Sequence, residues 1–93
     1  MARIAIARKH TLTHRKAREA AQKVADDLKK RFALNYEWKD DTIAFHRPGL
    51  RGEMHVGKTD IRLDAELGLL LTVLKPAIEQ EVDKEFAKRF GKA

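Results

Sequence analysis

The stretch Thr42–Leu67, "TIAFHRPGLRGEMHVGKTDIRLDAEL", alternates apolar and polar residues in three short runs. The apolar residues that share a face are Ile43 with Phe45, Met54 with Val56, and Ile61 with Leu63 and Ala65. Two segments with the composition of turns, "RPGLRG" and "GKTD", separate the runs. This pattern predicts three consecutive antiparallel strands with one buried side.

The residues before this stretch predict two further strands and a helix. Leu34, Tyr36 and Trp38 alternate with polar residues up to the turn "KDD", and "RIAIAR" near the N-terminus alternates in the same way. Residues 14–32 place apolar side chains at helical intervals, and Thr11 or Thr13 can cap this helix. The members of the apolar stripe are Ala17, Ala20, Ala21, Val24, Leu28 and Phe32.

A second helix is predicted over about residues 68–90, with a stop at Gly91. Its apolar stripe consists of Leu67, Leu70, Leu71, Leu74, Ile78, Val82, Phe86 and Phe90. We therefore assign Leu70, Leu71 and Leu74 to the core. Pro76 falls inside this pattern and predicts a kink, because proline has no N–H to donate to the carbonyl of Thr72.

Leu69 and Val73 lie off the apolar stripe and form a candidate interaction patch. One interpretation packs them against the first helix or the strand ends. The other exposes them for a dimer contact or for contact with a hydrophobic surface. We favour exposure for Leu69, which would lie in the first helical turn, and a core position for Val73.

Together the elements predict one domain, residues 1–93, in the order β-α-β-β-β-β-α. The simplest arrangement is an α+β fold, with an antiparallel sheet of about five strands and two helices packed on one face. The other face of the sheet is expected to be polar and solvated.

The composition excludes several classes of function. The chain has no cysteine and no serine, which rules out disulfides, thiolate metal sites and serine or cysteine nucleophiles. The N-terminus does not have the pattern of a signal peptide, and no apolar run is long enough to span a bilayer. We expect a cytoplasmic protein without a membrane span.

The basic charge of the chain is concentrated in its first third. The net charge is +6, and residues 1–31 hold ten Lys and Arg against three acids. Basic side chains crowd the expected start of the first helix, beside free backbone N–H groups that suit an anion. The predicted anion-binding residues are Arg8, Lys9, Arg15, Lys16 and Arg18. A merely solvated basic face is the alternative.

The four histidines do not form a recognisable catalytic or metal site. His10 and His14 are four residues apart, but His10 is expected to precede the helix and no carboxylate is nearby. His46 and His55 are expected on the polar face of the sheet with Glu53, where they are read as surface residues rather than an acid–base pair. We therefore expect no catalytic residue, no metal ligand and no cofactor.

Four segments together resemble one bacterial family, the polyhydroxyalkanoic acid (polyhydroxyalkanoate) system proteins. They are "IAIARKHTL" (4–12), "AREAAQKVADDL" (17–28), "YEWKDDTIAFHRPGLRGEMHV" (36–56) and "ELGLLLTVLKPAIEQEVDKEF" (66–86). None of these segments is a catalytic signature. The resemblance implies a role in polymer storage and supplies no reaction.

The resulting functional expectation is a non-enzymatic accessory protein that acts by surface interaction. A polyhydroxyalkanoate granule, a granule protein and a second copy of the chain are the partners left open. The alternative is a nucleic-acid- or ribosome-binding domain that uses the basic N-terminal third. The expected position of Tyr36 and Trp38 disfavours this alternative. Bases stack on exposed aromatic side chains, whereas these two are expected on the buried face of the sheet.

Overall fold

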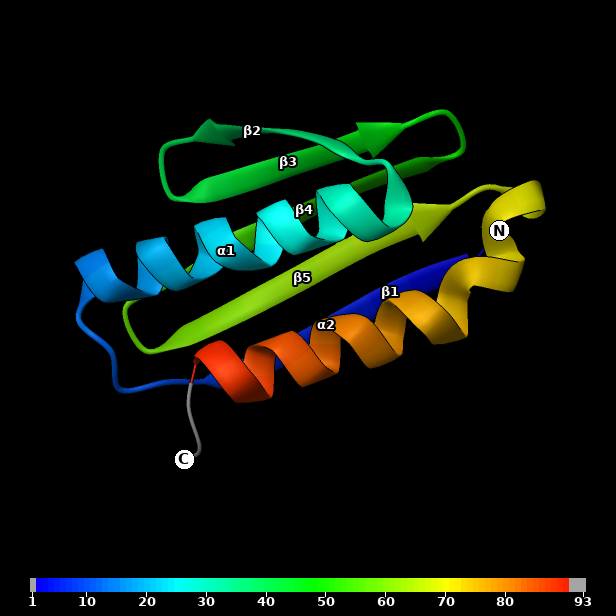
Figure 1. Cartoon of the computed structure of the whole chain (residues 1–93). Helices are drawn as coiled ribbons and strands as arrows, with labels where there is room; N and C mark the ends of the chain where they lie inside the picture. The colour runs from blue at the N-terminus through cyan, green and yellow to red at the C-terminus, as the bar shows by residue number, and fades with distance from the viewer. Residues whose placement is uncertain (1, 91–93) are drawn as a thin grey trace.

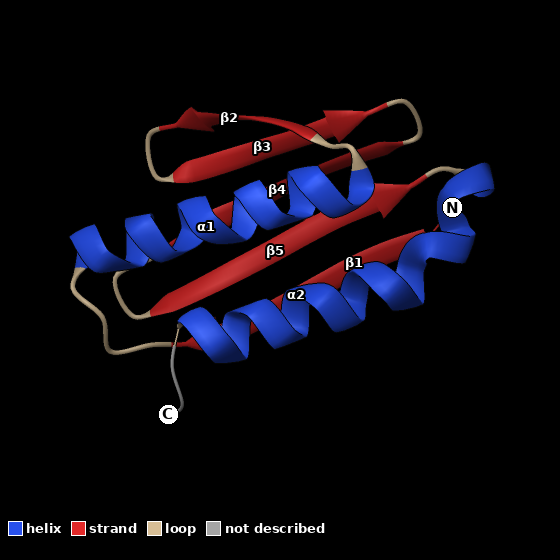
Figure 2. Ribbon diagram, viewed as in Figure 1, coloured by secondary structure: helices blue, strands red, loops and turns tan. Residues whose placement is uncertain are grey.

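A five-stranded antiparallel sheet forms one layer of the structure, and two α-helices lie against one of its faces (Figures 1 and 2). The computed structural model describes residues 2–90. Its elements are β1 (Ala2–Lys9), α1 (His14–Phe32), β2 (Asn35–Lys39), β3 (Thr42–Arg47), β4 (Leu50–Val56), β5 (Asp60–Leu67), the 3₁₀-helix η1 (Leu69–Leu74) and α2 (Lys75–Arg89). The strand order is β1-β5-β4-β3-β2, which leaves β1 and β2 at the edges. The predicted α+β fold and its order of strands and helices are confirmed.

The alternation in the sequence sets the register of the sheet. Met54 of β4 lies opposite Ile43 of β3 and Leu63 of β5, and Leu63 in turn lies opposite Ile6 of β1. A continuous apolar row therefore crosses four strands on the side that the helices cover. Residues at the intervening positions, such as Glu53, are exposed on the other side. We call this uncovered side the open face.

Helix α1 begins and ends at residues suited to those positions. The N–H of Lys16 donates to Oγ1 of Thr13 at 3.2 Å, so Thr13 rather than Thr11 is the cap. Ala33 ends the helix in the left-handed region, with φ of 57°. Small residues on the buried face of α1, among them Ala17 and Ala21, let the helix lie close to the sheet.

Helix α2 completes the hydrophobic core. Ile78, Val82 and Phe86 point into it, and Phe90 follows at the end of the helix. The rings of Phe86 and Phe90 meet edge to face, with 5.6 Å between their centroids. The predicted stripe is thus confirmed from Ile78 onward, while the expected stop at Gly91 lies outside the described residues.

The first part of the expected second helix is a separate element, and the predicted kink at Pro76 is wrong. Residues 69–74 form the 3₁₀-helix η1, and α2 begins only at Lys75. Pro76 lies in the first turn of α2. A proline is tolerated there because the first N–H groups of a helix have no intrahelical partner to lose.

The tighter winding of η1 also changes which side chains are buried. A 3₁₀-helix has three residues per turn, so residues i and i+3 lie above one another. Leu71 and Leu74 therefore face the body of the protein, whereas Leu70 and Val73 face outward. The assignment of Leu70 to the core is wrong, as is the preference for a core position at Val73. The preference for exposure at Leu69 is confirmed.

Candidate functional site

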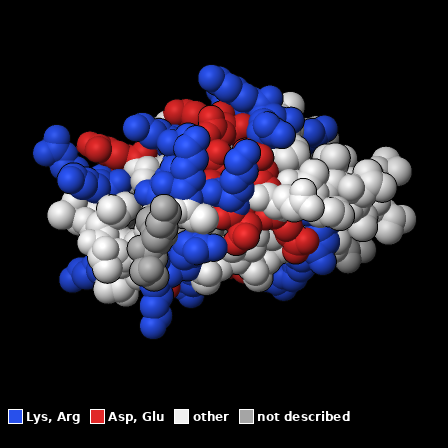
Figure 3. Space-filling view, turned by 60° about the horizontal axis from the view of Figure 1, so that its bottom comes forward, with Lys and Arg blue, Asp and Glu red and all other residues white. Residues whose placement is uncertain are grey.

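Three large apolar side chains of η1 project into solvent at one end of the molecule. Leu69, Leu70 and Val73 are 79%, 90% and 81% exposed, and no other large apolar side chain within residues 2–90 is comparably exposed. We call these three residues the apolar knob. In Figure 3 a white lobe projects on the right, at the end where Figure 1 places η1. Exposed apolar side chains grouped within one short element make the knob a candidate interaction site.

Contacts with the turn between β3 and β4 hold the knob against the sheet. The N–H of Gly68 donates to the carbonyl of Gly49 at 2.7 Å, and the Leu71 side chain lies over Gly49. A Cβ atom at Gly49 would stand 3.0 Å from Cδ1 of Leu71, and Gly49 has φ of +88°. Glycine at position 49 is therefore required both by the backbone and by the packing of Leu71.

Hydrogen bonds within η1 hold the knob in a defined shape. The N–H of Leu71 donates to the carbonyl of Gly68 at 3.0 Å, and Oγ1 of Thr72 donates to the same carbonyl at 3.2 Å. The outward apolar side chains are thus presented by a folded element that is fixed to the sheet.

The predicted anion-binding residues do not converge on one surface. Arg8 donates to Asp83 of α2 at 3.2 Å on the helix side of the sheet, whereas its neighbour Lys9 points to the open face. Arg15 lies 3.6 Å from Glu19 on the surface of α1. These cations are dispersed over the molecule, and their binding of an anion stays a prediction.

Arg18 belongs to a polar cluster that joins α1 to β2. Its guanidinium donates to Oδ1 of Asp41 at 2.7 Å and lies 4.2 Å from the ring centroid of Trp38. Nε1 of Trp38 donates to Gln22 at 2.7 Å. Trp38 is half-buried: it packs against the core, and Arg18 lies over its ring. The ring is therefore not a free platform on which a base could stack.

Tyr36 completes this cluster. Its hydroxyl donates to Asp26 and is in turn contacted by the Gln22 amide. The hydrogen bond to the Asp26 carboxylate, together with burial, raises the pKa of Tyr36 above its ordinary value. Tyr36 packs against the core with Trp38, as the sequence predicted.

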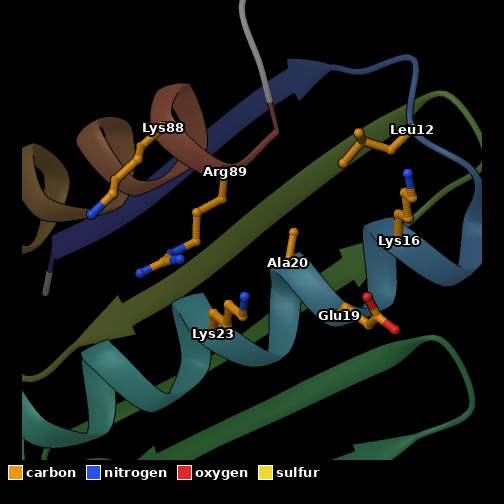
Figure 4. A pocket seen from close by; sticks show the side chains of 7 residues that line it. All are labelled: Leu12, Lys16, Glu19, Ala20, Lys23, Lys88 and Arg89. Atoms are coloured by element: carbon orange, nitrogen blue, oxygen red, sulfur yellow. The ribbon is translucent and has the colours of Figure 1, made fainter.

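Lys16, another of the predicted cations, lines a groove between the two helices. The lining of this groove includes Leu12, Ala20 and Glu19 together with three lysine side chains (Figure 4). The lysines are Lys16 and Lys23 of α1 and Lys88 of α2. Sequence reasoning missed Lys23, although its spacing of seven residues from Lys16 indicates one helix face. Lys88 could not be found without knowing which face of α2 meets α1.

Ion pairs at the contact between the two helices were also missed. Arg89 donates to Glu85 at 2.5 Å and to Asp27 of α1 at 2.9 Å. The hydrogen bond from Arg89 holds the pKa of Asp27 below its usual range, and the bond to Glu85 raises the pKa of Arg89. Farther along, Arg31 lies 3.4 Å from the buried Glu81. Glu81 and Glu85 interrupt the apolar pattern of α2. Which residues of α1 lie opposite α2 could be known only from the tertiary structure.

The two histidines on the open face are separated. His55 lies opposite Thr42 on β3, with 3.1 Å between Nδ1 and the threonine hydroxyl, whereas His46 lies opposite Arg51. Thr42 and His46 are four residues apart on one strand, which corresponds to about 13 Å. The histidines therefore do not form a pair.

The other two histidines have structural partners. His10 is buried rather than solvated: its Nε2 lies 3.1 Å from the carbonyl of Gly57, and its Nδ1 accepts from the N–H of Leu12 at 3.2 Å. His14 lies 2.9 Å from Asp41, and this contact lowers the pKa of that carboxyl. Among residues 2–90, no three His, Asp or Glu side chains are grouped so that they could hold a metal ion.

Comparisons with known proteins relate this chain to a described family. Neither helix in the described part of the chain is long and apolar enough to cross a membrane. No curated protein and no solved structure matches the sequence. A family model does match, over residues 4–90, and it describes polyhydroxyalkanoic acid system proteins. Because this match covers nearly the whole chain, the protein belongs to the polyhydroxyalkanoic acid system family.

Proposed function

We propose that this protein is a non-enzymatic accessory protein of the polyhydroxyalkanoate system, and that it acts in the cytoplasm at the surface of polymer granules. The observation that carries the proposal is the apolar knob, whose three side chains are at least 79% exposed. A stored polyester presents a hydrophobic surface, and the family description connects the chain with that polymer. The knob would provide the contact.

The energy available from the knob suits reversible attachment. Full burial of one large aliphatic side chain contributes about 1.5–3 kcal/mol. Part of the energy from three such side chains offsets the translational and rotational freedom that the protein loses on binding, and only the remainder holds it on the surface. We therefore expect exchange between the granule and the solution rather than permanent insertion.

The absence of catalysis is part of this proposal. His46 and His55 lie about four residues apart along the strand direction, and Glu53 stands opposite Ala44 between their rows. A general acid and base must both reach one substrate. A polymer or thioester hydrolysis that is present in the purified protein and lost in His46→Ala or His55→Ala would contradict this part.

The granule contact is tested with purified polymer particles. Leu69→Lys combined with Val73→Lys should sharply reduce co-sedimentation with the particles, because the added charges would have to leave water. The melting temperature should stay near that of the unaltered protein, since both side chains are exposed. A matched control places the same two charges at the opposite end, as Thr11→Lys with Thr59→Lys, both at exposed positions.

The control variant should bind the particles like the unaltered protein. Equal binding by the knob variant would refute the granule contact through η1. Sedimentation velocity without particles identifies the competing result, in which the knob variant loses self-association and the knob is a contact between copies of the chain.

A second candidate function is binding of a nucleic acid through the groove between the helices. It is favoured by Lys16, Lys23 and Lys88, which line that groove. Such binding would weaken steeply with salt, because displaced counterions drive it. Replacing all three lysines with Glu should abolish it in a titration with labelled RNA or DNA, and no binding at low salt removes this candidate.

A further inference from the structure

The topology gathers basic side chains around the base of the knob. The start of β1, the end of α1, the β3–β4 turn, the end of β5 and the start of α2 all lie at the end of the molecule that carries η1 (Figure 1). We call residues 2–3, 29–35, 47–51 and 66–76 the knob end. Its cations are Arg3, Lys29, Lys30, Arg31, Arg47, Arg51 and Lys75, and its one acid is Glu66.

Most of this charge is not neutralised within the described chain. Lys29, Lys30 and Arg51 are exposed, and no carboxylate within residues 2–90 forms an ion pair with them. On the open face Glu66 lies between Arg3 and Arg51 in the register of the sheet, and Glu53 and Asp64 line the same depression one row farther from the knob. The knob end therefore keeps a positive potential.

The cations lie on both sides of the sheet with the knob between them. Arg51 projects from the open face of β4, while Lys29 and Lys30 lie in the last turn of α1 on the covered side. In Figure 3 basic side chains stand above and below the place where the white lobe joins the rest of the molecule, and acidic side chains lie between them. A shallow hollow beside the knob is lined by Arg47, Arg51 and Glu66.

This arrangement distinguishes between two kinds of apolar surface. A bare polyester offers no anion, so cations pressed toward it would lose water without gaining a partner. A phospholipid layer with acidic headgroups offers acyl chains to the knob and phosphates to the surrounding cations. The charge of the knob end is complementary to the second surface.

We propose that the knob end docks on an anionic phospholipid layer, with Leu69, Leu70 and Val73 among the acyl chains and the surrounding Lys and Arg against the phosphates. This inference rests on the proposed function, because it specifies the chemistry of the surface that the knob meets. It also fixes the orientation of the molecule on the surface, since within residues 2–90 only the knob end combines exposed large apolar side chains with cations.

The test is flotation of the full chain with vesicles of phosphatidylcholine alone and of phosphatidylcholine mixed with phosphatidylglycerol. Binding should require the acidic lipid and weaken with salt. The triple variant Lys29→Glu, Lys30→Glu, Arg51→Glu should bind the mixed vesicles at least about a hundredfold more weakly, because each basic residue contributes roughly fivefold.

A charge-matched control separates oriented docking from general attraction. Lys9→Glu, Lys58→Glu and Arg62→Glu make the same change in net charge at the opposite end, where all three cations are exposed. This control should lose about tenfold at most, because its charges lie beyond the reach of the headgroups. Equal losses in the two triple variants, or equal binding of the unaltered protein to both kinds of vesicle, would overturn the proposal.

Bare polymer particles, assayed in parallel, keep this inference apart from the proposed function. Binding to the particles but not to acidic vesicles would overturn the lipid proposal and leave the granule contact standing. Binding to acidic vesicles but not to the particles would support the lipid proposal alone. A stable dimer that buries the knob and does not float with vesicles would overturn both.

Discussion

At the scale of single residues, neighbouring leucines of η1 have opposite surroundings. Leu71 lies over Gly49 and packs against the core, whereas Leu70 is 90% exposed. The two side chains are chemically identical, so their difference comes only from the direction in which the backbone points them. Leu71 holds the knob in place, and Leu70 forms its outermost surface.

The same substitution at these two positions should have very different effects on stability. Leu70→Lys should change the free energy of unfolding by no more than about 0.5 kcal/mol, as is usual for an exposed site. Leu71→Lys should lower it by about 1–3 kcal/mol, because a charged group would displace an apolar contact. Urea denaturation followed by circular dichroism measures both, and equal costs would contradict the orientation of η1.

At the scale of elements, Pro76 separates η1 from α2. The N–H of Lys75 donates to the carbonyl of Thr72, as in a 3₁₀-helix. Pro76 has no N–H, so it cannot make the α-helical hydrogen bond to that carbonyl. Residues 69–74 therefore stay in the tighter winding that turns Leu70 and Val73 outward. The position of this proline is what makes the knob a separate element.

Pro76→Ala should allow α2 to extend toward Gly68. A continuous α-helix has 3.6 residues per turn and would bring Leu70 onto the stripe that continues at Ile78. We expect more helical signal in circular dichroism and weaker binding to polymer particles. If the helical signal and the binding both match those of the unaltered protein, the proline does not control the winding of η1.

The sequence was sufficient for the strands and α1 but not for η1. Alternation over five to eight residues distinguishes one side of a strand from the other, and the apolar stripe of α1, from Ala17 to Phe32, extends over about four turns. Six residues such as Leu69–Leu74 are too few to separate a period of 3.0 from one of 3.6. Leu69 and Val73 were therefore found as a candidate patch, while Leu70 was misplaced in the core.

At the scale of the whole molecule, ion pairs tie the two helices together above the sheet. Asp27 and Arg31 of α1 are matched with Arg89 and Glu81 of α2. Glu81 and Glu85 are buried, so each would be costly without its arginine. These pairs depend on the relative position of α1 and α2, which neither helix reveals by its own sequence.

Acid should weaken this connection through Asp27. The pKa of Asp27 is held below its ordinary value near 3.8 by Arg89, so its contribution to stability is present above that pH and is lost as the pH falls through the lowered pKa. Asp27→Asn should therefore lose less stability than the unaltered protein between pH 7 and pH 3. Urea midpoints at the two pH values test this, and parallel profiles would show that the Asp27–Arg89 pair does not contribute.

The position of the knob at the tip of an elongated molecule determines how much of a surface each copy would occupy. The molecule measures 38 × 24 × 20 Å, and η1 lies at one end of the longest dimension (Figure 1). A copy attached by that tip stands upright, and its footprint is set by the two shorter dimensions. It covers roughly half the area that it would cover lying on its side, because the 38 Å dimension points away from the surface. Dense coverage would then place the far ends of many copies, with the start of α1, in an outer layer open to other molecules.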